Sequence, residues 1–433
     1  MKKCISFVLV MMLIIVFSVS SFSAADYGCN VETTSSAVYL ENLNTGNVIL
    51  EKNAEEKMYP ASLTKIMTYI IVTENIPDLE NTTITIKEEA FTGLDPESSV
   101  MGLKDHIGKA FPVIDLLYGM MVPSGNDAAY VLADYVGDGV IENFVDKMNR
   151  KAGQLGCKGT HFVNPHGLYD SNHYSTAKDM AIISKYALDK PHFMEIAGTS
   201  RYTVAGMNST IVTTNYMIDQ SYPQYYYPYI TSGKTGYTDE AGKCLMTTAQ
   251  KDDYKYLCIA LGASYSVAED INYAMLDTKE LYTWSFDNIS FTELMPENEV
   301  LKRLPVEFVW GNEMLNAVVE KGVTALLPKN YDKALVTTQV DLPDYVSAPV
   351  EKGEVLGSVK VLYDGEVVGT TNIVSPRDIE RDQSNYLMHR FIGFVVNNII
   401  VISIVLCILV IVIAVKISTH KNKKKRQSRY RYR

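Results

Sequence analysis

The sequence is poor in cysteine and histidine, and its basic residues are outnumbered by acidic ones. Its 433 residues contain six cysteines and seven histidines, and neither type follows a spacing typical of metal ligands. The formal net charge is −10, whereas a nucleic-acid-binding domain carries a basic face. The sequence therefore predicts neither a metal site nor nucleic-acid binding, and its length allows two or three domains.

The N-terminus has the pattern of a secretory signal. Two lysines precede an apolar run over residues 5–17, and small residues follow at 21–25. This order predicts a signal peptide over residues 1–25 that is removed by cleavage. The alternative is a retained membrane anchor, but the apolar run is short for a bilayer span. The residues before Cys29 do not suit a lipoprotein signal.

The C-terminus contains a second apolar run, over residues 394–415, which is interrupted by Asn397, Asn398 and Ser403. It is long enough to cross a bilayer as a helix. Residues 416–433 are strongly basic, and such a tail stays on the cytoplasmic side of the membrane. We therefore expect a single-pass protein of the cell membrane, with its catalytic domain outside the cytoplasm.

Four cysteines lie between these two apolar segments. They are Cys29, Cys157, Cys244 and Cys258. An exported protein can form disulfides, but the sparse, irregular positions fit free buried thiols equally well. His161, His166 and His173 lie close together in the sequence, and we expect a structural role for them.

The tetrapeptide Ser62-Leu63-Thr64-Lys65 is the motif around which the chain is organised. Pro60 precedes it as a helix start signal, and the apolar run 66–72 suits a buried helix. The spacing puts Ser62 and Lys65 on one helix face. A serine is a weak nucleophile until a base takes its proton, and lysine can be that base when burial and a helix N-terminus lower its pKa. Taken alone, the motif is more often a helix cap followed by a surface lysine.

Two further motifs follow in order. Ser124-Gly125-Asn126 predicts a tight turn that presents a hydroxyl and an amide. Lys234-Thr235-Gly236 offers a cation and a hydroxyl to a negative group, and its glycine lets another backbone come close. Each motif alone is typical of a turn or a strand end. Together, S-x-x-K, S-x-N and K-T-G form the signature of penicillin-recognising serine enzymes.

The residues around the motifs narrow this resemblance. The stretches 60–68, 124–129 and 233–238 resemble the low-molecular-weight penicillin-binding proteins, the D-alanyl-D-alanine carboxypeptidases. The same is true of residues 160–168 and of residues 173–179 after them. The resemblance covers roughly residues 30 to 290.

Pattern and resemblance predict an α+β catalytic domain of the β-lactamase and DD-peptidase type over residues 30–287. Strands at 37–40 and 48–50 form a hairpin, and strands at 244–249 and 254–262 form a second pair. The helices expected between these pairs lie at 112–121, 127–135, 142–155 and 176–188. We also expect a short strand at 83–86, a loop at 95–108 and a closing helix at 269–286. The antiparallel sheet is flanked by helices, and the three motifs meet where it joins the helical insertion.

After a polar linker at 287–304, residues 300–385 are expected to form a small all-β domain. Short alternating runs broken by Gly and Pro support it, and it resembles the β-rich C-terminal domain of the carboxypeptidases. The aromatic residues at 225–230 could stack on a substrate, although packing or a surface strand is the more common role.

The resemblance implies the roles of the catalytic residues. Ser62 attacks the penultimate D-alanine carbonyl of peptidoglycan stem peptides ending in D-alanyl-D-alanine, and Lys65 is the general base. Ser124 passes a proton toward the leaving D-alanine, and Asn126 binds the substrate amide. Water then frees the acyl-enzyme, no metal or organic cofactor is implied, and β-lactam antibiotics act as covalent inhibitors.

The resemblance also implies a substrate-binding strand. Lys234 and Thr235 bind the terminal carboxylate, Gly236 allows close approach, and the backbone N–H of Tyr237 completes an oxyanion hole with that of Ser62. The chain departs from relatives that place an arginine near this strand, because no arginine occurs between residues 201 and 303. Carboxylate binding is therefore expected to depend on Lys234 and Thr235 alone.

Three other functions are open on the same fold. A class A β-lactamase uses a glutamate to activate the deacylating water, and residues 164–166 (Asn-Pro-His) offer none. A penicillin sensor needs a signalling domain, and the tail here is short. A silent wall-binding protein would be expected to lack a motif residue, and all are present.

Overall fold

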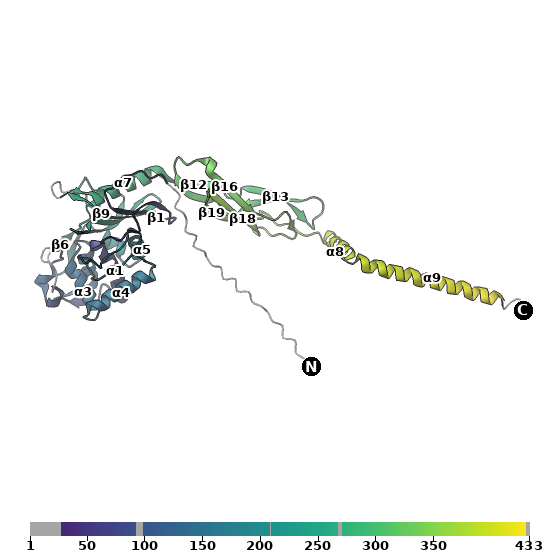
Figure 1. Cartoon of the computed structure of the whole chain (residues 1–433), viewed down its shortest axis with the longest axis horizontal. Helices are drawn as coiled ribbons and strands as arrows, with labels where there is room; N and C mark the ends of the chain where they lie inside the picture. Colours follow the sequence, from purple (N-terminus) through teal and green to yellow (C-terminus); the bar gives the residue numbers. More distant parts are fainter. Residues whose placement is uncertain (1–26, 92–97, 208, 267–270, 430–433) are drawn as a thin grey trace, which may run out of the picture. The chain divides into compact units, whose positions relative to one another are not determined.

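The computed structural model describes residues 27–91, 98–207, 209–266 and 271–429 (Figure 1). The predicted signal peptide, residues 1–25, therefore lies outside the described residues. The chain forms two compact units. The first ends at Ser290 and also includes Leu326–Tyr331, and the second comprises Phe291–Ala325 and the chain from Asp332 onward.

The first unit is built on a five-stranded antiparallel sheet with the strand order β2-β1-β9-β8-β7. Its strands are β1 (Ala37–Asn42), β2 (Val48–Lys52), β7 (Ile230–Thr238), β8 (Gly242–Lys251) and β9 (Tyr254–Ala263). Both predicted strand pairs are confirmed. The sheet thus joins the two ends of this unit, since β1 pairs with β9.

Both faces of this sheet are covered. In β9, Leu257, Ile259 and Leu261 belong to the large core shared with the helical insertion, whereas Ala260 packs with residues of α7 (Tyr273–Asn288). Successive side chains of a strand point to opposite faces, so β9 is apolar on both sides. Figure 1 shows α7 along one face and α1 (Thr64–Asn75) with its neighbouring helices on the other.

The predicted helical insertion is present between the two strand pairs. Besides α1 it contains α2 (Val113–Met121), α3 (Asn126–Val136), α4 (Ile141–Gln154), α5 (Ala177–Leu188) and the short α6 (Phe193–Ala197). Small hairpins extend it, formed by β3 (Thr83–Thr85) with β4 (Ala110–Pro112) and by β5 (Arg201–Val204) with β6 (Ser209–Val212). Every α1 residue from Thr64 to Val72 is buried. A helix that is buried on all sides is a core helix, as the sequence predicts.

Two local predictions are wrong, and a third is confirmed for its described residues. Residues 287–304 are not a polar linker, because they contain β12 (Ile289–Met295) and most of β13 (Val300–Glu307). The charged residues of β13 face outward, while Leu304 is fully buried. Residues 225–229 are not a strand, since β7 begins at Ile230. The loop expected at 95–108 is confirmed over residues 98–108, which contain the short 3-10 turn η3 (Leu103–His106), and its residues 95–97 lie outside the described residues.

The second unit is rich in β-structure, as predicted. Its six-stranded sheet has the order β16-β18-β19-β14-β13-β17. Besides β13 the strands are β14 (Met314–Val319), β16 (Val336–Asp341), β17 (Val346–Ser347), β18 (Val355–Tyr363) and β19 (Glu366–Val374), and β15 (Val323–Pro328) pairs with β12. Leu304, Leu315 and Val359 lie in its apolar core. Alternating residues of each strand therefore supply one buried face.

The chain continues into two helices, α8 (Gln383–Asn397) and α9 (Ile399–Arg429). Within the segment Ile399–Lys421 an 18-residue window has a mean hydropathy of 3.3, and none of that window is buried. The length and composition of the segment suit a membrane span. It begins a few residues later than the predicted span, 394–415, because Asn398 ends α8.

Cys29, Cys157, Cys244 and Cys258 are free thiols in the part of the chain that the structure describes. Burial raises the pKa of the Cys258 thiol to about 12 and that of Cys244 to about 11. Of the two alternatives that the sequence leaves open, the structure therefore has free thiols.

Candidate active site

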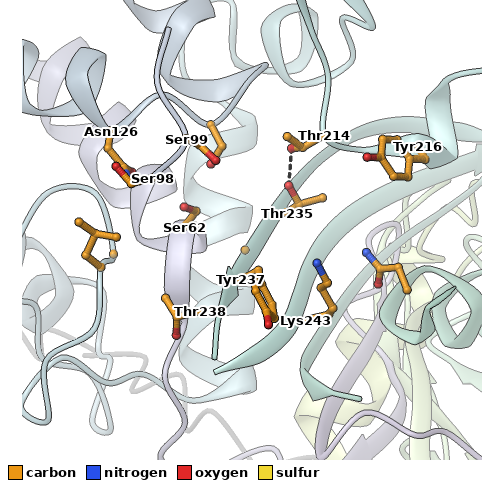
Figure 2. A pocket seen from close by; sticks show the side chains of 15 residues that line it. Ser62, Ser98, Ser99, Asn126, Thr214, Tyr216, Thr235, Tyr237, Thr238 and Lys243 are labelled. Carbon is orange, nitrogen blue, oxygen red and sulfur yellow. Dashed lines mark hydrogen bonds between the residues drawn. The ribbon is translucent and has the colours of Figure 1, made fainter. Parts of the chain in front are cut away.

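A cavity of about 310 Å³ opens beside β7 in the first unit (Figure 2). Six of the eight predicted site residues line it: Ser62, Ser124, Asn126, Thr235, Gly236 and Tyr237. Lys65 and Lys234 are buried, with exposed fractions of 0% and 1%. The three motifs thus meet at the junction of the sheet with the helical insertion.

Ser62 lies in a 3-10 turn, η1 (Ala61–Leu63), which leads directly into α1. The Nζ atom of Lys65 is 2.8 Å from Ser62 Oγ. It is also 2.7 Å from Asn126 Oδ1 and 2.7 Å from the carbonyl oxygen of His166. The side chains of the first motif therefore meet as its spacing predicts.

Burial holds the pKa of Lys65 well below its ordinary value, and the nearby charge of Lys234 lowers it further, whereas Asp127 acts in the opposite direction. The Asn126 and His166 oxygens can only accept hydrogen bonds. When the amine is neutral, these two oxygens can take its two N–H groups, which leaves its lone pair for the Ser62 hydroxyl. Lys65 lies in the first turn of α1, as expected, and Lys234 adds a second positive neighbour that the sequence did not indicate.

Lys234, the lysine of the third motif, is hydrogen-bonded to the serine of the second motif. Its Nζ donates to Ser124 Oγ at 2.8 Å and to the Thr235 carbonyl oxygen at 2.8 Å. Burial lowers the pKa of Lys234 to about 7. Ser124 itself has φ 66°, a left-handed conformation that few non-glycine residues adopt. This turn directs its hydroxyl toward Lys234.

The strand β7 runs past the turn that carries Ser62. A Cβ atom on Gly236 would lie 3.0 Å from the backbone nitrogen of Ser62 and 3.0 Å from the Pro60 carbonyl oxygen. Such contacts are too close for most side chains, so glycine permits the approach. Next to it, the Thr235 hydroxyl hydrogen-bonds that of Thr214, and Tyr237 is 42% exposed at the cavity.

Asp127, which the sequence analysis missed, supports the side of the cavity that is lined by Ser98 and Ser99. Asp127 accepts hydrogen bonds from the backbone N–H groups of Met101, Gly102 and Leu103, at 2.7, 3.0 and 3.0 Å. These bonds fix the segment that brings Ser98 and Ser99 to the cavity. Asp127 follows the second motif directly, but its partners lie about 25 residues away, where no local pattern indicates them.

Thr214, Tyr216, Lys243 and Asn272 also line the cavity and were not predicted. The aromatic run 225–229 does not line it, which leaves packing as its role: Tyr225 is 2% exposed within an apolar cluster. Two of the histidines are structural and neutral. Burial lowers the pKa of His173 to about 4 and that of His166 to about 3.

Comparisons with known proteins agree with this geometry. Residues 23–265 match the family described as D-alanyl-D-alanine carboxypeptidase, and residues 292–381 match the C-terminal domain of penicillin-binding protein 5. The chain belongs to the D-alanyl-D-alanine carboxypeptidase family. This confirms the predicted resemblance and the predicted fold class, and it makes the protein a serine peptidase.

Relatives of this carboxypeptidase family cover most of the chain. D-alanyl-D-alanine carboxypeptidase DacF of Bacillus subtilis is 30% identical over 390 residues, which are 88% of this chain and 95% of the relative. DacA of Escherichia coli is 30% identical over 78% of this chain and 82% of its own length. Penicillin-binding protein 5 of Haemophilus influenzae is 28% identical, with a TM-score of 0.59, over 81% of this chain and 98% of that structure. The β-lactamase, sensor and silent-protein alternatives are not favoured.

Proposed function

We propose that this protein is a serine carboxypeptidase that removes the terminal D-alanine from peptidoglycan pentapeptide stems through an acyl-enzyme on Ser62. The observation that carries the proposal is the buried Lys65 Nζ, 2.8 Å from Ser62 Oγ. Its other two partners are oxygens that only accept, so the amine is oriented as a base. The relatives named D-alanyl-D-alanine carboxypeptidase support the substrate class.

In the acylation step, Ser62 Oγ attacks the carbonyl carbon of the penultimate D-alanine, and Lys65 takes the hydroxyl proton. The negative charge that develops on the carbonyl oxygen is stabilised by the backbone N–H groups of Ser62 and Tyr237. The close passage of Gly236 beside the Ser62 nitrogen supports this pairing.

Departure of the D-alanine needs a proton on its nitrogen. Ser124, whose hydroxyl lies at the cavity and is held by the Lys234 ammonium, passes to that nitrogen the proton that Lys65 took from Ser62, so Lys65 is neutral again. Asn126 Oδ1 accepts a hydrogen bond from Lys65. The Nδ2 group of Asn126 therefore donates to the substrate amide. Water then releases the acyl group, with the same amine as base.

Penicillin is expected to acylate Ser62 and to leave slowly. The loop at 164–166 lacks the glutamate with which class A β-lactamases activate water, and it supplies instead the His166 carbonyl that holds Lys65. A stable penicilloyl-enzyme therefore follows from this site.

The test is the substitution Ser62→Ala in the full-length protein. Labelled penicillin should attach to the wild type and the variant should lose both labelling and D-alanine release from a pentapeptide. Thr64→Ser, two residues away and buried, is the matched control for packing. Persistent labelling of the Ser62 variant would contradict the assignment.

We also propose that α9 crosses the cell membrane and holds the catalytic unit outside, facing the wall. The apolar segment Ile399–Lys421 and the basic residues that follow it support this orientation. High salt or carbonate should not release the full-length protein from membranes, whereas a chain ending near Asn385 should be soluble and active. Release of the intact protein by salt would instead indicate a helix lying on the membrane surface.

A further inference from the structure

The two motif lysines are poorly placed to meet a substrate carboxylate directly. Lys65 and Lys234 are buried below the cavity, and Lys234 already donates to Ser124 and to the Thr235 carbonyl. Among the described residues that line the cavity, the one with a charged side chain is Lys243. A carboxylate entering the cavity therefore meets this lysine first.

Lys243 lies on β8, directly opposite Tyr237 of β7 in the strand register. Its Nζ atom is 3.9 Å from the ring centroid of Tyr237 and 3.9 Å from that of Tyr265. Two aromatic faces at this distance attract and orient an ammonium group. The position of the charge is thus set by the folded structure and does not depend on the ligand.

Figure 2 shows Lys243 with Tyr237 and Thr235 on one side of Ser62, and Asn126 with Ser98 and Ser99 on the other. A peptide bound along β7 with its scissile carbonyl at Ser62 has one residue beyond that carbonyl, the terminal D-alanine. The part of the peptide that precedes the scissile carbonyl lies toward Asn126, which binds the substrate amide. The carboxylate of the terminal D-alanine therefore points toward the side of the cavity that holds Lys243.

Asn272 is a second polar residue at this side of the cavity. It lies opposite Tyr265 in the β10–β11 ladder (Tyr265–Ser266 and Ile271–Asn272), and it lines the cavity. Its Oδ1 atom is buried and has no hydrogen-bond partner among the described residues. An amide oxygen only accepts hydrogen bonds, so this atom would pair with a donor such as a substrate N–H, and a contact from Asn272 to a carboxylate would have to come from its Nδ2 group. Asn272 occupies the N-cap position of the 16-residue helix α7 without a side-chain capping bond, and the N-terminus of a helix carries partial positive charge.

We propose that Lys243 binds the C-terminal carboxylate of the substrate, with the carboxamide of Asn272 beside it. This inference rests on the proposed function. It replaces the expectation that Lys234 and Thr235 bind the carboxylate alone. Lys234 instead acts on the Ser124 hydroxyl, Thr235 contacts the carboxylate from β7, and Lys243 makes the enzyme specific for peptides with a free C-terminus.

The experiment uses the full-length protein in detergent and two acyl-D-alanyl thioesters. In one the leaving thiol carries a carboxylate, and in the other that carboxylate is a methyl ester. Lys243→Met should lower kcat/KM for the carboxylate thioester by about 10- to 100-fold, the range for a hydrogen bond to a charged group. Its rate on the methyl ester should equal that of the wild type, and Lys243→Arg should retain most of the discrimination.

Lys251→Met is the matched control. Lys251 also lies on β8 with its Nζ over a tyrosine ring, 5.1 Å from the centroid of Tyr229, but it does not line the cavity. This variant should keep the wild-type ratio between the two thioesters. Equal thermal unfolding of both methionine variants controls for folding.

Two results would overturn the inference. One is a Lys243→Met variant that keeps the wild-type ratio of kcat/KM between the carboxylate and methyl ester thioesters. The other is a variant whose kcat/KM falls equally for both thioesters. The proposed function has its own readout, the release of D-alanine from a pentapeptide by the wild type. If the wild type releases D-alanine and the Lys243 variant keeps its ratio, only the inference about Lys243 is wrong. If the wild type releases none, the proposed function itself is wrong.

Discussion

The two units of this protein differ in what they bury. The first buries charged side chains around the cavity, among them Lys65, Lys234 and Asp127. Among the described residues of the second unit, the buried polar side chains are those of Thr371 and Ser375, and neither is charged. Buried polar groups are costly unless they are paired. The first unit thus buries charged groups, at a cost in desolvation, where catalysis needs them, while the described part of the second unit has an apolar core without buried charges.

The largest expected effect concerns the base in the first unit. In Lys65→Arg a guanidinium replaces an amine that must be neutral to take a proton, and arginine remains protonated at all relevant pH values. The rate of penicillin acylation should fall by about 10²- to 10⁴-fold, the usual range for loss of a general base. Stopped-flow acylation measures it, and a variant that acylates at the wild-type rate would show that burial of Lys65 serves packing alone.

A smaller effect separates the two buried lysines by their pH dependence. Lys65 must be neutral, so activity rises with pH through its lowered pKa. Lys234 must be charged, so activity falls as pH rises through its pKa of about 7. In Lys234→Arg the cation does not titrate, and the alkaline decrease, about tenfold per pH unit in the wild type, should disappear although overall activity is reduced.

The measurement is a profile of kcat/KM between pH 6 and pH 9, with a thermal unfolding curve at each end. An alkaline decrease that persists unchanged in Lys234→Arg would assign this limb to another group. Lys234 would then be a buried charge of the first unit without a catalytic role.

The smallest effect on activity is expected from the second unit. Leu315 is fully buried there, and Leu315→Ala should lower its free energy of unfolding by about 2–5 kcal/mol. Penicillin labelling should stay at the wild-type rate below the melting transition of that unit. The matched substitution Leu257→Ala, in the sheet of the first unit, should lower the temperature at which labelling is lost. Equal losses of labelling in both variants would contradict the separation of chemistry from scaffold.

The sequence predicted the elements and site residues that depend on local spacing. Ser62 and Lys65 meet because one helical turn separates them, and the alternating runs at 37–40 and 254–262 became strands. Asp127 was missed because its amide partners lie about 25 residues earlier. Lys243 was missed because only strand pairing brings it beside Tyr237. The strand β13 was missed because its outward face carries the charges that suggested a linker.

The pairing of β1 with β9 sets the order in which the molecule can mature. Ala37 pairs with Leu261, more than 200 residues later in the chain, and such long-range contacts form slowly. If the chain is exported N-terminus first, as the predicted signal peptide implies, Ser62 emerges early, but β7 and Lys234 come late. The nucleophile is therefore inactive until the last strands of the sheet have arrived, so an incompletely exported chain has no working acyl-transfer site.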